Sequence, residues 1–168
     1  RREYIYFGAS VCAVDVNDDG YDDLIVGAPF YSGKGGDEGR VYIYLSSEIQ
    51  SIPGRRVLTL SSGENSLDPG LRGSNTKGAR FGWSLAKTGD LNNDKIQDFI
   101  VGAPQDQPDL NNDGFGNGAI YIYHGRRDGK FDKYQQVCLL YTTEHDIHDK
   151  VGCIPTPVIR RISLVEKS

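Results

Sequence analysis

The sequence predicts an all-β chain built from two four-stranded antiparallel sheets. Three observations support this prediction. The 168 residues include 21 glycines and 10 tyrosines, a composition that suits short strands joined by many turns. Stretches with helical periodicity are scarce. A long series of motifs also occurs twice along the chain, which is the pattern expected when one structural unit is repeated.

The two copies of the motif series align over most of their length. Phe7-Gly8 recurs as Phe81-Gly82, and the acidic segment 15–23 recurs as 90–98. The segment Gly-Ala-Pro ends at Pro29 and again at Pro104, and Val-Tyr-Ile-Tyr at 41–44 returns as Ile-Tyr-Ile-Tyr at 120–123. The second unit is slightly longer than the first between its last two motifs. The additional residues fall in the polar loop 105–117, where an insertion is tolerated.

Each unit is expected to form four short strands. In the first unit they fall near residues 10–15, 23–28, 40–45 and 57–60, and in the second near 83–89, 98–103, 119–123 and 134–141. The third strands are aliphatic on one face and aromatic on the other, which fits a sheet that is covered on both sides. A blade of a β-propeller is such a sheet, because neighbouring blades stack on its two faces.

The repeats divide the chain into three segments. Residues 1–62 form the first unit, 63–136 the second, and 137–168 a divergent tail that carries neither motif and is expected to be irregular or disordered. The chain contains no methionine and begins with a strand-like segment, so we expect it to be a processed or partial chain. Two blades cannot close a propeller, and we therefore expect the isolated chain to be marginally stable or to associate with itself.

The first acidic loop has the donor spacing of a cation site. Asp15, Asn17, Asp19 and Asp23 occupy positions 1, 3, 5 and 9, and the main-chain carbonyl of Tyr21 stands at position 7. Alternate side chains of a tight loop can converge, and these donors are all oxygens. Calcium takes six to eight oxygens, whereas zinc prefers histidine or cysteine and magnesium demands a stricter octahedron. The sequence therefore predicts a calcium site that stiffens the connection between two strands.

The second acidic loop repeats this spacing with one departure. Asp90, Asn92, Asp94 and Asp98 supply side chains, and the carbonyl of Ile96 stands at position 7. Gly20 at position 6 of the first loop permits a left-handed turn, but Lys95 stands at that position here. A side chain in the left-handed region costs on the order of 1 kcal/mol. We expect the second loop to bind calcium less tightly than the first.

Other interpretations of these acidic segments fit less well. Solvated acidic turns are common, but two in register, each followed by Gly-Ala-Pro, are hard to explain that way. An EF-hand needs a glutamate at position 12, where Val26 and Val101 stand instead. The acidic stretch 109–117 lies between strands two and three and is interpreted as a polar hairpin loop. His145 and His148 with Cys153 make a poor metal site, because no second ligand pair matches them.

Several functional classes are disfavoured by composition. The net charge of −4 and the pI near 5.3 argue against nucleic acid as a partner. No run of 18 apolar residues exists, so no membrane insertion by this segment is expected. No arrangement typical of a catalytic nucleophile stands out, and we expect no enzyme activity. Three cysteines leave at least one unpaired, and Cys12 is expected to be a small core residue.

Four motifs in the same order, twice over, carry a resemblance to a known family. Phe-Gly, an aspartate-rich loop, Gly-Ala-Pro and Val-Tyr-Ile-Tyr resemble the FG-GAP repeat of integrin alpha-subunit propellers, over residues 7–136. The resemblance implies a calcium-binding segment that acts in cell adhesion and signalling at the extracellular face of the plasma membrane. It also implies an integrin beta subunit as partner, together with extracellular matrix or cell-surface protein ligands of the intact propeller.

Two alternatives remain open at this point. FG-GAP repeats also occur beside catalytic domains, as in glycosylphosphatidylinositol phospholipase D, so the chain could be an accessory propeller domain of a secreted enzyme. A free-standing, calcium-dependent, sugar-binding propeller is the third interpretation. Sequence flanking the repeats would discriminate the first two, and glycan binding that is lost on chelation would identify the third.

Overall fold

The computed structural model describes residues 5–33, 36–49, 51, 53–61, 70–106, 118–131, 136–141 and 150–155. For residues 136–141 and 150–155 it describes the backbone alone. All nine elements in these ranges are strands, which confirms the predicted all-β fold. No helix in the described part of the chain is long and apolar enough to cross a membrane.

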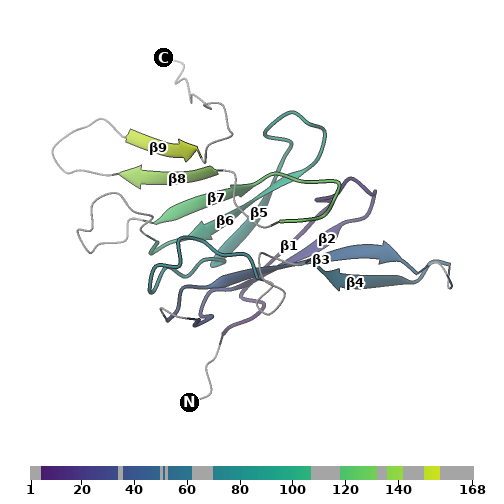
Figure 1. The fold of residues 1–168 in the computed structure, drawn as a ribbon, viewed down its shortest axis with the longest axis horizontal. Coiled ribbons are helices and arrows are strands. Elements are labelled where there is room, and N and C mark those ends of the chain that lie inside the picture. The colour runs from purple at the N-terminus through teal and green to yellow at the C-terminus, as the bar shows by residue number, and fades with distance from the viewer. Residues whose placement is uncertain are drawn as a thin grey trace.

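The first sheet contains four antiparallel strands in sequence order (Figure 1). They are β1 (Ser10–Val14), β2 (Asp23–Ala28), β3 (Arg40–Glu48) and β4 (Arg56–Leu60). Strand β2 is an almost continuous apolar run, and its only half-buried residue is Leu24. A strand buried on both faces is expected to read this way. The four strands follow the predicted positions of the first unit closely.

The second sheet repeats this order and continues it by one strand. It contains β5 (Ser84–Gly89), β6 (Asp98–Ala103), β7 (Ala119–Tyr123), β8 (Gln136–Tyr141) and β9 (Lys150–Pro155), all antiparallel to their neighbours. The register shifts between Lys87 and Gly89, just before the second acidic loop.

Strand β9 corrects one expectation. The tail 137–168 was predicted to be irregular, but residues 150–155 pair with β8 along its whole length. An edge strand presents a row of free amide and carbonyl groups, and any extended segment can pair with them without a sequence motif. Residues 142–149 and 156–168, which include His145 and His148, lie outside the described residues, as does the acidic stretch 109–117.

The hydrophobic core lies between the two sheets. Strand β5 runs beside β1 and β2, so the sheets stack face to face. The first sheet contributes aliphatic side chains to this core, among them Val14, Ile25 and Val41, all fully buried. The second sheet contributes mainly aromatic side chains, including Phe99, Tyr121 and Tyr123. Cys12 is half-buried and packs against this cluster, as predicted.

Glycine permits a very close approach of the two backbones. A side chain on Gly27, in the Gly-Ala-Pro motif of the first sheet, would collide with the carbonyl oxygen of Gly82. A side chain on Gly39 would collide with the backbone of Phe81, whose strand bridge to Gly39 is parallel. The Phe-Gly motif of one unit therefore sits directly on two glycines of the preceding unit, and larger residues there would force the sheets apart.

Equivalent aromatic clusters occupy one face of each sheet. In the second sheet the ring of Phe81 is buried against those of Tyr121 and Tyr123. In the first sheet Phe7 contacts Tyr42 with 5.6 Å between ring centroids, but Phe7 is 50% exposed. The difference arises because the first sheet covers the cluster of the second, whereas no described residue covers the cluster of the first in the same way.

Candidate metal centre

The two acidic loops occupy corresponding places in the two sheets. The first connects β1 to β2 and the second connects β5 to β6. Each therefore lies between the first and second strands of its sheet, as the repeat predicted. Both loops are short, and their ends are fixed by the antiparallel pairing of the flanking strands.

The first loop is folded around its own carboxylates. Asp15 accepts hydrogen bonds from the amides of Asp19 (3.2 Å) and Gly20 (2.9 Å). The Asn17 side-chain oxygen accepts from the Asp19 amide at 3.2 Å, and Asp19 Oδ1 accepts from the Tyr21 amide at 2.9 Å. The bonds of Asn17 and Asp19 reach two residues on and are Asx turns, and those of Asp15 reach four and five residues on, so the three side chains lie on the inner side of one tight bend.

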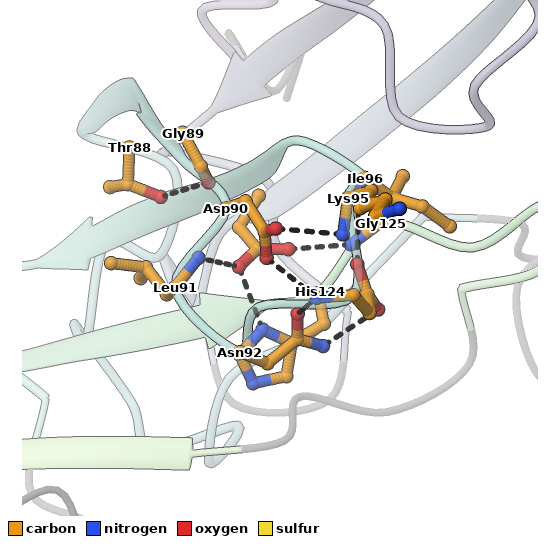
Figure 2. Close-up of polar contacts among 11 residues, drawn as sticks. Thr88, Gly89, Asp90, Leu91, Asn92, Lys95, Ile96, His124 and Gly125 are labelled. Carbon is orange, nitrogen blue, oxygen red and sulfur yellow. Dashed lines mark hydrogen bonds and ion pairs between the residues drawn. The ribbon is translucent and has the colours of Figure 1, made fainter.

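The second loop repeats every one of these contacts. Asp90 accepts from the amides of Asp94 (3.0 Å) and Lys95 (2.7 Å), and Figure 2 shows Asp90 facing Lys95 across the bend. The Asn92 oxygen accepts from the Asp94 amide at 3.1 Å, and Asp94 Oδ1 accepts from the Ile96 amide at 2.9 Å. Two sequences that differ at several positions thus adopt the same fold around the same three side chains.

The ninth residue of each loop is anchored in the sheet. The carboxylate of Asp23, 1% exposed, accepts from the amides of Val16 (3.0 Å) and Ser46 (2.8 Å). Burial raises the pKa of Asp23, although the bonds from Ser46 and Val16 oppose the increase. Burial thus disfavours the ionised carboxylate, and a cation bound next to it would offset this cost, because an opposite charge favours the ionised form.

Asp98 occupies the same place in the second sheet but has one additional partner. Its carboxylate is fully buried and accepts from the amides of Leu91 (2.7 Å) and Gly125 (2.9 Å). The Nδ1 atom of His124 lies 3.0 Å from Asp98 Oδ2. Burial would raise the pKa of Asp98, but the contact with His124 and the two amide bonds outweigh burial and lower it.

His124 is the functional neighbour that the sequence analysis missed. The match of segment 41–44 with 120–123 could have indicated it, because His124 then aligns with Leu45, the residue before Ser46. The Ser46 amide donates to Asp23, so the equivalent residue Gly125, and His124 before it, are expected to lie against Asp98.

The sixth residue is left-handed in both loops. Gly20 has a φ of 87° and Lys95 a φ of 75°, which confirms that Lys95 adopts the conformation expected of glycine. The fourth residues, Asp18 and Asn93, are also left-handed, with φ of 61° and 62°. Lys95 therefore carries conformational strain that the first loop avoids.

The donors of both loops suit a hard cation, although they are not drawn together in this structure. In the described ranges no three or more His, Cys, Asp or Glu side chains form a group that could hold a metal ion. Each carboxylate has about four lone-pair sites, and the loop amides use only some of them. All side-chain donors are oxygens, and the half-buried Tyr21 and the buried Ile96 hold the carbonyls predicted for position 7. The residues fit calcium in chemistry and order along the chain.

Several polar and aromatic residues outside the two loops have ordinary surroundings. Arg126 pairs with Asp128 at 2.8 Å, and both are exposed. This pair lowers the pKa of Asp128 to about 2. Trp83 is 46% exposed and packs edge-on against Phe30. These contacts are those of surface charges and of a packing residue.

Comparison with known proteins identifies the repeat. The family described as "FG-GAP repeat" matches residues 7–44 and 81–123, which are the two segments that the motif alignment selected. The chain carries two FG-GAP repeats. Each matched segment begins at the Phe-Gly motif and ends with the third strand of its sheet, so the two sheets are FG-GAP blades of a β-propeller.

Integrin alpha subunits are among the relatives of this chain. The chain is 40% identical to integrin alpha-4 of Xenopus laevis over 131 residues and 41% identical to integrin alpha-E of Mus musculus over 132 residues, 78% of the chain in each case. It is 39% identical to integrin alpha-PS2 of Drosophila melanogaster over 137 residues. The aligned part spans 11%, 10% and 9% of these relatives. None of the three carries an enzyme's name, in agreement with the prediction that the chain is not an enzyme.

Proposed function

We propose that this chain is a calcium-binding propeller segment of an integrin alpha subunit, acting in cell adhesion and signalling. The observation that carries the proposal is the repetition of one loop geometry around the same donor series in both sheets. In the first loop the ligands are Asp15, Asn17, Asp19, Asp23 and the carbonyl of Tyr21. In the second they are Asp90, Asn92, Asp94, Asp98 and the carbonyl of Ile96.

Calcium would supply positive charge where the loops concentrate negative charge. Without a cation, three carboxylates within one short bend repel one another. The amide bonds that each carboxylate accepts orient it without using all its lone pairs, so the bend is prepared for an ion. The role is structural: the ion fixes the connection between the first two strands. At a concentration 100 times its dissociation constant, calcium stabilises the fold by roughly 2.7 kcal/mol.

The first loop should bind calcium more tightly than the second. It carries two further aspartates, Asp18 and Asp22, whereas the second loop has Lys95 next to its ligands. Asp98 also shares its carboxylate with His124, while the contacts of Asp23 described above come from two amides. Local charge and competition for lone pairs therefore favour the first loop.

Isothermal titration calorimetry with site variants tests this proposal. The wild-type chain should bind two calcium ions, Asp15→Asn with Asp19→Asn should remove the tighter one, and Asp90→Asn with Asp94→Asn the weaker one. Asp128→Asn is the matched control, because it removes an exposed aspartate outside both loops and should leave both sites intact. A wild-type chain that takes up no calcium at millimolar concentration would refute the proposal.

The second part of the proposal concerns the longer protein to which these repeats would belong. We infer that residues 1–62 and 63–136 are successive blades of a larger propeller on the extracellular face of the plasma membrane. That propeller would pair with an integrin beta subunit and help to bind matrix or cell-surface proteins. The names of the relatives favour this over an accessory domain of a secreted enzyme. The full-length transcript should encode further FG-GAP repeats and a downstream membrane span; an upstream catalytic domain would contradict the assignment.

A further inference from the structure

One turn of the second sheet contacts both acidic loops. Residues 124–129 follow β7, and we call them the bridging turn. Three of these residues are consecutive and carry the argument: His124, Gly125 and Arg126. The first two contact the second loop, and the third contacts the first loop, although the two loops belong to different sheets.

The contact with the second loop is tight and specific. The amide of Gly125 donates to Asp98 Oδ1 at 2.9 Å, and the His124 ring meets Asp98 Oδ2 at 3.0 Å. Figure 2 shows His124 and Gly125 lying against this loop. A side chain on Gly125 would collide with the side chain of Ile96 and the carbonyl of Gln97. The bridging turn therefore fixes the position of a proposed ligand and of the residue that bears the carbonyl at position 7.

The contact with the first loop begins one peptide bond further along. The amide of Arg126 donates to the carbonyl of Val16 at 2.7 Å, and the amide of Val16 in turn donates to Asp23 Oδ2 at 3.0 Å. The guanidinium of Arg127 adds an ion pair with Asp18 of the same loop at 2.7 Å. This pair is exposed at both ends, so its contribution is small beside that of the backbone bond.

These contacts form an uninterrupted chain between two proposed calcium ligands. It runs from Asp98 to the amide of Gly125, through one peptide unit to the amide of Arg126, and through Val16 to Asp23. Asp98, Asp23, Gly125 and Val16 are buried, so the bonds to the two carboxylates are shielded from water, whereas Arg126 is exposed. An ion that fixes Asp98 restrains the Gly125 amide and, with it, the adjacent peptide that holds Val16.

We propose that the bridging turn couples the two loops, so that calcium at one loop raises the affinity of the other. This inference rests on the calcium binding proposed above. The first ion orders the bridging turn, and the second ion then binds a loop whose neighbour is already ordered. Coupling between sites is reciprocal and commonly amounts to about fivefold or more in affinity. Gly125 and Arg126 are thus positioning residues, which act on the ions through Asp98 and Asp23.

Calcium titration followed by NMR tests the coupling site by site. The amide resonances of Gly20 and Lys95 report the first and second loops separately. In a chain with Asp90→Asn and Asp94→Asn, the affinity measured at Gly20 should fall about fivefold below that of the wild type. In a chain with Asp15→Asn and Asp19→Asn, the affinity measured at Lys95 should fall by the same factor.

The bridge itself is tested by removing one amide. Arg126→Pro deletes the donor to Val16, and Arg126→Ala is its matched control because it keeps the amide and loses only the side chain. Coupling should vanish in Arg126→Pro and persist in Arg126→Ala. Should Arg126→Pro fail to fold, hydrogen exchange at the Arg126 amide gives the answer in a chain with Asp15→Asn and Asp19→Asn: calcium at the second loop should slow it.

The outcomes separate this inference from the proposed function. The coupling would be overturned, and calcium binding left intact, by two results together. In each loop variant the remaining site would bind calcium with wild-type affinity, and the exchange rate of the Arg126 amide would not change on adding calcium. A wild-type chain whose Gly20 and Lys95 resonances do not respond to calcium would overturn both.

Discussion

The ring of Phe81 packs edge-on against the ring of Tyr121, with 5.1 Å between the two centroids and both side chains fully buried. This pair joins the start of the second sheet to its third strand and lies against the first sheet. We expect Phe81→Ala to lower the free energy of unfolding by about 3–5 kcal/mol, because it empties a large volume in the core. Urea denaturation followed by fluorescence measures the loss.

Phe7→Ala is the matched control for this prediction. Phe7 occupies the same motif position and contacts Tyr42 in the same way, but it is 50% exposed. Its removal should cost only about 1 kcal/mol, which is typical of a partly exposed side chain. Equal losses in the two variants would contradict the view that the first sheet covers the second.

The left-handed Lys95 gives a second prediction. Lys95→Gly should raise the free energy of unfolding in calcium-free buffer by about 1 kcal/mol, because glycine adopts a φ of 75° without strain. Gly20→Lys makes the reverse change in the first loop and should lower stability by a similar amount. Thermal or urea unfolding of the two variants measures both effects. Changes of the same sign in both variants would rule out strain at position 6 as their cause.

The uncovered faces of the two sheets lead to a third prediction. Val11 is 63% exposed, whereas its equivalent Leu85 packs against the core; Ile120 is 46% exposed, whereas its equivalent Val41 is fully buried. The face of the first sheet that carries Val11 (its front) and the face of the second sheet that carries Ile120 (its back) are therefore exposed equivalents of the two faces that meet between the sheets. We expect the isolated chain to associate head to tail, which sedimentation velocity would detect.

A mixing experiment distinguishes this from unspecific association. Val11→Glu blocks the front face and Ile120→Glu blocks the back face, so each variant alone should sediment as a monomer. A mixture of the two should form a one-to-one dimer, since each variant keeps the face that the other has lost. A wild-type chain that remains monomeric and unfolds sharply and reversibly would contradict the prediction.

The fourth prediction concerns alkaline pH. Burial raises the pKa of Tyr121 above its ordinary value, and the charge of Asp106 and its hydrogen bond with the phenol raise it further. The unfolded chain therefore releases this proton at a lower pH than the folded chain. The folded state holds more protons above about pH 10, so stability falls as the pH rises through that region.

Tyr121→Phe tests this assignment through the change of the free energy of unfolding with pH, and not through its value at one pH. The substitution removes the hydrogen bonds of the hydroxyl to Asp106 and from the Ser74 amide, so stability near neutral pH should fall. The loss of stability on raising the pH from about 9 to about 11 should, however, be smaller than in the wild type. An identical slope in the two chains would show that other groups govern alkaline unfolding.

Most of the fold could be predicted from the sequence, because the repeated motifs are clear and each one concerns only a short segment. Each motif indicates its own strand or turn, and two copies in order placed the strands of both sheets close to their observed positions. Strand β9 was missed because pairing at a sheet edge depends on backbone groups, which have no sequence signature. The alternation of donors likewise indicated both loops, and their shared hydrogen bonds agree with it.

The sequence could not indicate what surrounds the loops. The contact of His124 with Asp98 joins the ends of two strands, and the bond from Arg126 to Val16 joins the two sheets. In both cases the partners are far apart in the sequence, so the motif of a single segment does not indicate the contact. The first contact arises when β7 pairs with β6, and the second arises only when the second sheet stacks on the first and brings the end of β7 over the first loop. Alignment of the two units could have placed His124, but the contact of Arg126 with the other sheet requires the stacked structure.

The close approach of Gly27 to Gly82 makes neighbouring units dependent on each other's sequence. A substitution at Gly27 would displace the unit that follows, while its own strand pairing could remain intact, so damage would emerge one unit downstream of the lesion. The same dependence limits how such an array can grow by duplication. A copied segment joins its new neighbour without a clash only when glycines accompany it on both sides of the junction.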